Sequence, residues 1–521
     1  MAQKNVEINV KTGGGYDQLY PLTKMANVID LSLTATNVSY SNTASGLQAT
    51  NVQTAIDELN VFNVETVTVN VSTDSMVSVA GSIITMTDNT DPTKTKSYTL
   101  TAGQSSASFN ATSQHGITVS VSAKAGFNSP TPVSFTAIGG NTRTVQMQYY
   151  RNVYGYRITK ANSDPYTRVE YTENSIGKTP SKMNYGTNTW EWGGWEPFIK
   201  EFFRPCMLNY NGTVAYYLDQ NDQTKKADGS PSDISNTSFG GNAMVEVKKL
   251  YTYEYEDATY SYHIVSDQKI DANYVAYPFT NASGVEKDFA YFPMFEGSLD
   301  SSNRMRSIAG QTISASKTGQ QEIDYVNNNG AGYYTDYWSA HNFMAVMHTL
   351  LGKSTDSQTV FGQGVTGASA AIQTGALKAS GGFFGYSNTT SCVKTFWMEN
   401  NWGNIFKRCM GVVTDGSSNM LVKMTAPYNP TGSGYINLGA VAGSGYIKNI
   451  VASNNGYEPI DTSGSATTYF CDYFYKSANC YGSVSGHWSY GSDCGCFFLR
   501  LNAAFSVSDT TIGCRPFFIN P

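Results

Sequence analysis

The chain has 521 residues, of which 14% are charged, and its formal net charge is −6 at pH 7. This weak acidity, without a lysine or arginine cluster, excludes the electrostatic footprint of a nucleic-acid-binding protein or of one that binds an anionic membrane. No stretch approaches the ~18 apolar residues of a membrane span, so we expect no membrane insertion. The 36 tyrosines and 48 glycines, with frequent serine, threonine and asparagine, indicate a β-rich protein with a binding surface.

Residues 1–63 contain little hydrophobic mass. Residues 49–59 predict a short helix, which Thr50 or Asn51 can cap. Val52, Ile56 and Leu59 fall on one face of it, and so short an apolar stripe cannot hold a lone helix in water. We therefore expect the stripe to pack on copies of itself around a threefold axis, which makes the protein a homotrimer.

Residues 64–148 alternate between apolar and polar side chains. Four segments predict strands, most with a period of two: 67–71, 82–87, 116–121 and 143–147. Turn residues such as those at 88–92 separate them. Several short strands with turn signals predict an immunoglobulin-like β-sandwich, whose expected role is that of a spacer.

Residues 149–521 predict one large domain of α+β class, mostly β. Strands are expected at 157–160 and 166–171, and the best helix at 337–351, ending with a cap at Gly352-Lys353. Glu254 and Glu256 alternate with tyrosines along one predicted strand. They do not form the facing carboxylate pair that a glycosidase needs.

All seven tryptophans and all eight cysteines follow residue 189, as expected for a modular first third and a well-packed remainder. The first residues lack the apolar core of a secretory signal, so we expect folding in a cytoplasm. The cysteines are then expected to be free thiols that pack as small apolar groups. No CxxC zinc spacing occurs, and we predict neither a metal nor a cofactor.

Two segments of the first 63 residues resemble phage tail-fibre proteins. Residues 16–23 (YDQLYPLT) are similar to a segment near the start of many tail and baseplate-associated proteins. Residues 37–57, which run from NVSY through SGLQATNVQTAID, are similar to a stretch found in phage fibres. The resemblance implies that this end of the chain attaches to other virion proteins.

The last 140 residues resemble the C-type-lectin-like domains of phage proteins and of the variable proteins of diversity-generating retroelements, which share the formylglycine-generating-enzyme fold. The resemblance rests on residues 381–386, on Glu399 to Asn404 (ENNWGN), on residues 486–495 (GHWSYGSDCG) and on residues 512–515 (IGCR). It implies a scaffold of Trp402, Gly403, Trp488, Gly491, Gly495, Phe497 and Arg515. It also implies an outward binding face of His487, Ser489, Tyr490 and Asp493, with Tyr473, Tyr475, Tyr481 and Ser483 as further candidates.

The chain also departs from this family. Ser485 stands where the family more often has glycine, and Cys494 and Cys496 replace small or proline-like residues. The calcium-dependent sugar motif of lectins is absent, which argues against calcium-mediated sugar binding. Because enzymes of this fold use paired cysteines, Cys471, Cys480, Cys494 and Cys496 leave an oxidising enzyme open as an alternative.

These resemblances imply a fibre or receptor-binding protein of a phage virion, on its tail or head. Its expected partner is a host cell-surface glycan or protein, and it is expected to bind without catalysis. A capsule-degrading depolymerase and a purely structural head-fibre or decoration protein are the alternatives.

Overall fold

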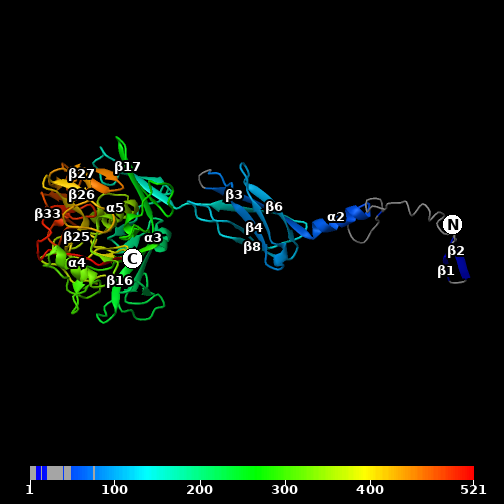
Figure 1. The fold of residues 1–521 in the computed structure, drawn as a ribbon, viewed down its shortest axis with the longest axis horizontal. Coiled ribbons are helices and arrows are strands. Elements are labelled where there is room, and N and C mark those ends of the chain that lie inside the picture. Colours follow the sequence, from blue (N-terminus) through cyan, green and yellow to red (C-terminus); the bar gives the residue numbers. More distant parts are fainter. Residues whose placement is uncertain (1–7, 13–14, 20–38, 40–47, 74–76) are drawn as a thin grey trace. The chain divides into compact units, whose positions relative to one another are not determined.

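The computed structural model describes residues 8–12, 15–19, 39, 48–73 and 77–521. The chain forms two compact units, one that ends at Arg151 and one that covers Asn152–Pro521 (Figure 1). This division lies close to the predicted boundary at 148/149. The protein is mostly β, with several sheets, as predicted. Within the described residues, every helix is too short or too polar to cross a membrane.

The first described residues form an antiparallel pair, β1 (Ile8–Thr12) and β2 (Gly15–Leu19). The first half of the tail-fibre-like segment at 16–23 falls on β2, and residues 20–23 lie outside the described residues. Most of the second segment, up to residue 47, lies outside them too.

Helix α2 (Val52–Phe62) confirms the predicted helix, although it begins at Val52 and extends beyond residue 59. Asn51 caps it: the Thr54 backbone N–H donates to Asn51 Oδ1 (2.8 Å), and the Asn51 N–H donates to Thr54 Oγ1 (3.2 Å). In the single chain, Ile56 is 44% and Leu59 48% exposed. These two residues of the predicted stripe are therefore about half exposed within the described part of the chain.

Residues 64–149 fold into a sandwich of two sheets, in the strand orders β6-β3-β9 and β5-β4-β7-β8. The bounds are β3 (Val64–Thr73), β4 (Ile83–Asp88), β5 (Lys96–Thr99), β6 (Ser106–Thr112), β7 (Gly116–Val121), β8 (Val133–Thr136) and β9 (Thr142–Tyr149), with a 3-10 turn η2 (Pro92–Lys94). Strand β3 buries every second side chain, among them Val67, Val69 and Val71, as its alternation requires. The four predicted strands are confirmed.

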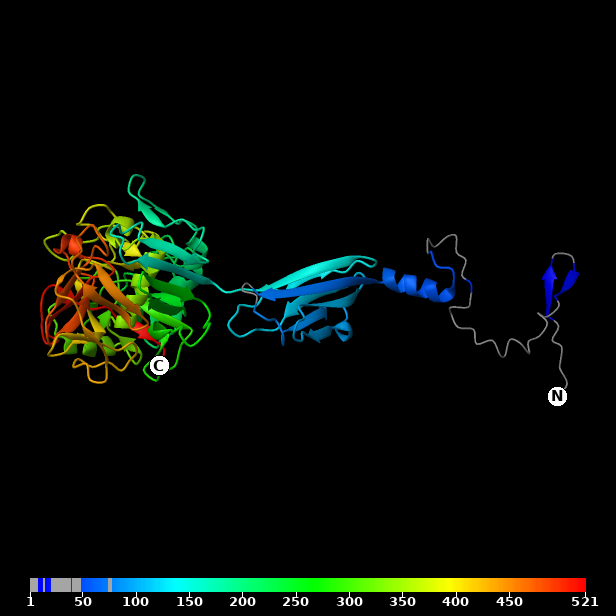
Figure 2. The same ribbon diagram turned by 90° about the horizontal axis from the view of Figure 1, so that it is seen from above.

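The strand order of this sandwich differs from that of an immunoglobulin constant domain. There the first strand pairs with the second, whereas here the first strand, β3, lies between β6 and β9 and runs parallel to β9. Figure 2 shows the blue and cyan strands of this sandwich side by side. The sequence predicted the sandwich because alternation reports which face is buried. Alternation contains no information on which strands are neighbours.

Three sheets build most of the second unit. A four-stranded sheet has the order β11-β10-β18-β17, with β10 (Val153–Thr159), β11 (Val169–Glu173), β17 (Tyr251–Glu256) and β18 (Tyr260–Ser266). A six-stranded sheet has the order β15-β14-β16-β19-β35-β22, with β14 (Phe203–Asn209), β15 (Val214–Tyr217), β16 (Gly241–Lys248), β19 (Phe289–Pro293), β22 (Tyr333–Tyr334) and β35 (Phe517–Ile519).

The third sheet supports the candidate site. Its order is β27-β26-β25-β32-β33-β31-β28, and β34 also pairs with β25. The strands are β25 (Phe406–Thr414), β26 (Asn419–Val422), β27 (Ile436–Ala440), β28 (Gly445–Tyr446), β31 (Tyr473–Lys476), β32 (Tyr481–Val484), β33 (Leu499–Ala503) and β34 (Ile512–Gly513).

Short elements connect these sheets. The two-stranded pairs are β12 (Lys182–Asn184) with β13 (Thr189–Glu191), β20 (Ser298–Leu299) with β21 (Met305–Arg306), β23 (Lys394–Thr395) with β24 (Met398–Glu399), and β29 (Asn449–Ser453) with β30 (Gly456–Asp461). The short helices are α3 (Glu196–Phe202), α4 (Gly319–Asn327) and α6 (Ser357–Phe361), and the 3-10 turns are η3 (Tyr277–Phe279) and η4 (Gly491–Asp493).

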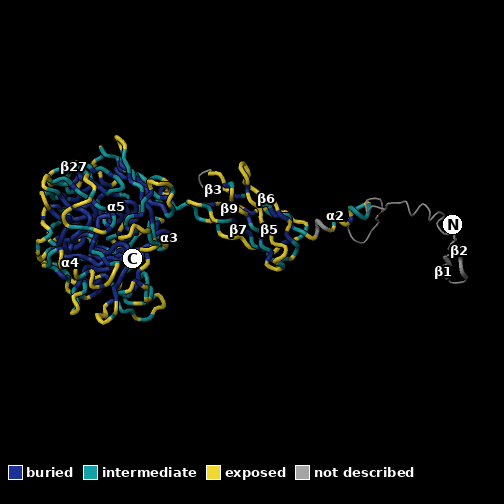
Figure 3. Tube along the Cα trace, viewed as in Figure 1, coloured by how far each residue is buried: buried dark blue, intermediate teal, exposed yellow. Residues whose placement is uncertain are grey.

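Helix α5 (Trp338–Gly352) confirms the predicted central helix. The sequence predicted one apolar face, but nearly every residue of α5 is buried, and the helix lies in the interior of the second unit (Figure 3). A helix enclosed on all sides needs apolar or internally bonded side chains all round. The cap also differs in detail, because Gly352 is the last helical residue and Lys353 adopts the left-handed conformation (φ 48°).

Candidate functional site

The Glu399–Asn404 motif forms a buried turn between β24 and β25. The Glu399 carboxylate accepts the backbone N–H groups of Gly375 (2.8 Å) and Leu377 (2.7 Å). The Trp402 indole is fully buried and donates to the Gly362 carbonyl (3.0 Å). Gly403 has φ +72°, and a Cβ there would lie 2.5 Å from the Val365 carbonyl oxygen, so only glycine fits.

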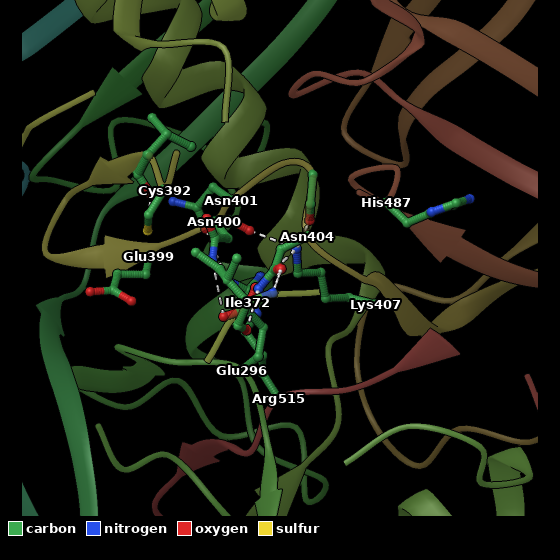
Figure 4. A network of polar contacts seen from close by, with 12 residues as sticks. Glu296, Ile372, Cys392, Glu399, Asn400, Asn401, Asn404, Lys407, His487 and Arg515 are labelled. Carbon is green, nitrogen blue, oxygen red and sulfur yellow. Dashed lines mark hydrogen bonds and ion pairs between the residues drawn. The ribbon is translucent and has the colours of Figure 1, made fainter. Parts of the chain in front are cut away.

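A buried ion pair lies directly beneath this turn (Figure 4). Lys407 Nζ lies 3.8 Å from Glu296 Oε1, and both side chains are fully buried. Lys407 Nζ also donates to the carbonyls of Asn400 (2.6 Å) and Gly403 (2.9 Å). The amides of Asn400 and Asn404 donate to the two Glu296 oxygens, at 3.3 and 3.1 Å. Burial lowers the pKa of Lys407 to about 8.

A second ion pair ties the end of the chain to the same turn. Arg515 Nε and Nη2 each lie 2.8 Å from Asp336 Oδ1, and Arg515 Nη1 donates to Asn401 Oδ1 (2.9 Å). Arg515 and Asp336 are both buried. Because these charges are satisfied by partners inside the protein, they support the turn and are not available to a ligand.

We call the Glu399–Asn404 turn and its two ion pairs the platform. The glycine-rich loop at 486–495 lies against it, since the Trp488 N–H donates to the Asn404 carbonyl (3.3 Å). A Cβ on Gly495 would lie 2.0 Å from the buried Asp472 carboxylate, which accepts the Phe497 N–H (2.6 Å). Phe497 is buried against Phe470, with ring centroids 4.8 Å apart. Gly491 opens the turn η4 with φ +57°.

Trp488 is an exception among the predicted scaffold residues, because its side chain is half-buried and does not fill the core. The loop is held here through its backbone: the Ala368 N–H donates to the Trp488 carbonyl (2.7 Å). Because a backbone hydrogen bond holds the loop here, the Trp488 side chain need not be in the core. The prediction that Trp488 belongs to the core is wrong.

Three predicted contact residues are buried, and the prediction that they point outward is wrong. Tyr481 and Ser483 lie on β32, a central strand between β25 and β33 whose four residues are all buried. His487 is only 6% exposed, and its ring packs 4.6 Å from Phe406. Burial lowers the pKa of His487 to about 4, which keeps the imidazole neutral.

The other predicted contact residues lie at the surface, and most of them meet. Tyr473 and Tyr475 stand on one face of β31, with ring centroids 4.5 Å apart. Tyr490 lies 5.7 Å from the Tyr475 ring. Asp493 accepts the Tyr475 hydroxyl (3.0 Å). These four side chains are half-buried, and Ser489, beside Tyr490 in the chain, is exposed.

The sequence did not identify Tyr446, which completes this group. Tyr446 lies on β28 opposite Tyr473, and its hydroxyl donates to Asp493 (2.6 Å). Its ring centroid is 5.0 Å from that of Tyr473. Only the pairing of β28 with β31 brings it there, so no local signal could have found it. We call Tyr446, Tyr473, Tyr475, Tyr490 and Asp493 the tyrosine face.

The tyrosine face rests on a small apolar core and is held by hydrogen bonds. Phe406, Phe498 and Ile512 form the buried cluster beneath Tyr473, Tyr475 and Tyr490. Burial, with the nearby Asp493 carboxylate, raises the pKa of Tyr446 to about 12, so this phenol remains a donor at neutral pH. The arrangement presents flat rings and fixed polar groups, as binding surfaces do.

The cysteines lie in the interior of the second unit. All eight are buried free thiols, as the sequence predicted for their packing. Burial raises the pKa values of Cys494 and Cys496 well above the ordinary thiol value, so neither is a thiolate at neutral pH. Among the described residues, three or more histidine, cysteine or carboxylate side chains nowhere gather as a metal site would require.

No protein-family model matches the chain, and no curated protein matches it. Among solved structures, the chain is similar to the Bacillus anthracis TIE protein over 48% of its own length and 46% of that chain, with 10% identity and a TM-score of 0.15. It is also similar to a candidate polysaccharide-binding protein of Bacteroides thetaiotaomicron over 43% of its own length and 85% of that chain, with 9% identity and a TM-score of 0.14. Similarity this weak carries no argument about function.

Proposed function

We propose that this chain is a receptor-binding subunit of a phage fibre, and that the tyrosine face contacts a molecule on the host surface without chemical turnover. The observation that carries the proposal is the grouping of four half-buried tyrosine rings around one carboxylate, above the buried cluster of Phe406, Phe498 and Ile512. Tyrosine supplies a large contact area at a small loss of side-chain entropy. Two of the phenols are already held by Asp493, so less freedom is lost when a ligand binds.

The platform and the face have separate roles in this proposal. The motif residues Glu399, Trp402 and Gly403 make their contacts inside the protein. Ser489 and Tyr490, which come later in the chain and before its last strands, stand at the surface. Changes in the side chains of the face would therefore leave the contacts of this motif in place. This arrangement suits the diversified proteins that the C-terminal motifs resemble, and a near-copy of the last coding stretch beside a reverse transcriptase gene would test that relationship.

The exposed stripe on α2 supports the expected homotrimer and attachment of the first segment to other virion proteins. Ile56 and Leu59 present apolar surface that copies of the helix would cover. Three tyrosine faces on one fibre would bind a repetitive cell surface with greater avidity than one, without any new contact.

The proposal is tested by binding of the labelled full-length protein to whole cells of a panel of bacterial strains and to an array of their surface glycans. We expect Tyr473→Ala to weaken binding by about 30-fold, because a central aromatic contact is typically worth ~2 kcal/mol or more. The matched control is Tyr262→Ala in the four-stranded sheet β11-β10-β18-β17. It removes a half-buried tyrosine whose ring is stacked 4.6 Å from that of Tyr255. Equal losses in the two variants, or binding that survives deletion of residues 152–521, would reject the tyrosine face. Absence of binding by the full-length protein to every strain and glycan would favour a structural decoration protein.

A further inference from the structure

A polar pocket of about 550 Å³ lies at the β20–β21 hairpin, in the second unit. Its lining includes Tyr210, Phe239, Asp300, Arg304, Arg306 and Gln311, and none of these belongs to the tyrosine face. The volume falls within the ~300–1,000 Å³ typical of pockets that hold small molecules.

The charges of this lining favour an anion. Arg304 Nη1 lies 3.6 Å from Asp300 Oδ2, so these two charges largely offset each other. Arg306 is buried and forms no ion pair with any residue that the structure describes. One positive charge therefore remains, which matches a ligand with a single negative charge.

Arg306 is held rigidly in place. Its Nη1 donates to the Thr237 carbonyl (2.6 Å), and its Nη2 donates to the carbonyls of Phe239 (2.6 Å) and Gly241 (2.5 Å). Its buried Nε has no hydrogen-bond partner among the described residues. A guanidinium fixed by carbonyls, with donor capacity left over, is arranged in advance for a carboxylate and would lose little freedom on binding it.

The rest of the lining fits a polyhydroxylated ligand better than a simple anion. The Tyr210 ring lies under both arginines, with its centroid 4.8 Å from Arg304 Cζ and 5.6 Å from Arg306 Cζ. Phe239 adds a second half-buried ring. The exposed serines at 238, 301 and 302 add hydroxyl groups to the rim, and Gln311 adds an amide. Rings of this kind provide apolar contact, and hydroxyls and amides bond to a ligand's hydroxyl groups.

We propose that this pocket binds a carboxylate-bearing saccharide unit of the uronic-acid type. The carboxylate lies against Arg304 and Arg306, and the sugar ring lies against Tyr210 and Phe239. The proposal goes beyond the tyrosine face and does not depend on it. It assigns the second unit a site for acidic polysaccharide in addition to the proposed receptor contact.

Calorimetric titration of the full-length protein with trigalacturonate tests this site. We expect binding that weakens on replacement of the probe by its methyl ester, which has the same ring but no charge. We expect Arg304→Gln to weaken trigalacturonate binding by about 10- to 100-fold, as loss of a hydrogen bond to a charged group does. Arg304 is chosen because its side chain is 36% exposed, so its replacement leaves the fold intact.

The matched control is Arg157→Gln. Arg157 has the same kind of environment on β10: its side chain is 34% exposed, pairs with Glu170 (2.7 Å) and lies 4.1 Å over the Tyr260 ring. Unchanged binding in this variant and loss in Arg304→Gln support the site. Equal affinity for the ester, competition by acetate as strong as by galacturonate, or equal losses in both variants would each overturn it. Tyr473→Ala leaves this titration unchanged, so failure here and failure of the tyrosine face are distinguishable.

Discussion

The buried pair beneath the Glu399–Asn404 turn allows a quantitative test of the platform. Lys407→Met removes the cation that lies 3.8 Å from Glu296, while the carboxylate stays fully buried. It also removes the donor to two backbone carbonyls. Loss of one partner of a buried pair typically costs ~3–5 kcal/mol, because the remaining charge has no counterion. We expect the free energy of unfolding of the second unit to fall by about that amount.

The assay is guanidinium unfolding followed by tryptophan fluorescence. All seven tryptophans lie between residues 190 and 488, so the signal reports on the second unit alone. This matters because a chain with two compact units need not unfold in one step. The control is Lys182→Met, which breaks an exposed pair with Glu191 (3.7 Å) and is expected to cost ~0–1 kcal/mol.

A double variant distinguishes the unpaired charge from lost packing. Glu296→Gln, added to Lys407→Met, removes the buried carboxylate charge and should restore part of the lost stability. A loss below ~1 kcal/mol in Lys407→Met, or a double variant less stable than the single one, would refute the reasoning.

Three further predictions concern other parts of the chain. Burial lowers the pKa of His348 to about 4. Between pH 6.5 and 4 the unfolded chain therefore binds a proton that the folded chain does not, so this group lowers the free energy of unfolding by about 1.4 kcal/mol for each pH unit of acidification. Unfolding measured at several pH values should show a shallower dependence of stability on pH for His348→Gln. An unchanged dependence would contradict a neutral buried imidazole. Gly495→Ala places a Cβ 2.0 Å from Asp472 and should lower the free energy of unfolding by ~1–3 kcal/mol, which a lower melting temperature would show. The control is Gly381→Ala, whose Cβ meets nothing within 4 Å and should leave the melting temperature unchanged. Ile56→Glu puts a charge into the exposed stripe of α2 and should convert a trimer into monomers in sedimentation experiments; a wild-type monomer would rule out the assembly.

Local patterns determined much of the secondary structure. The period-two alternation placed β3, β4, β7 and β9, because burial of one sheet face acts on every second residue. The capping asparagine and the apolar spacing placed α2. The end of the alternating segment at residue 148 lies close to the division between the two compact units. The tryptophans and cysteines, all after residue 189, indicated only that the larger core lies in the second unit.

Tertiary pairing decided what local patterns could not. The sandwich has β3 beside β6 and β9 because neighbours in a sheet are chosen over long sequence separations, which alternation does not record. Nor could alternation show that β32 lies between two strands, which buries Tyr481 and Ser483, residues that resemblance alone placed at the surface.

The candidate site shows the same division. By itself, the sequence determined which residue types could form a contact surface, since Tyr473, Tyr475, Tyr490 and Asp493 lie within one short stretch of the chain. Only the tertiary structure decided that Tyr446 joins them and that His487 does not. Membership depends on which strands pair and which side of the loop faces the core, and those are set by packing contacts between residues far apart in the chain.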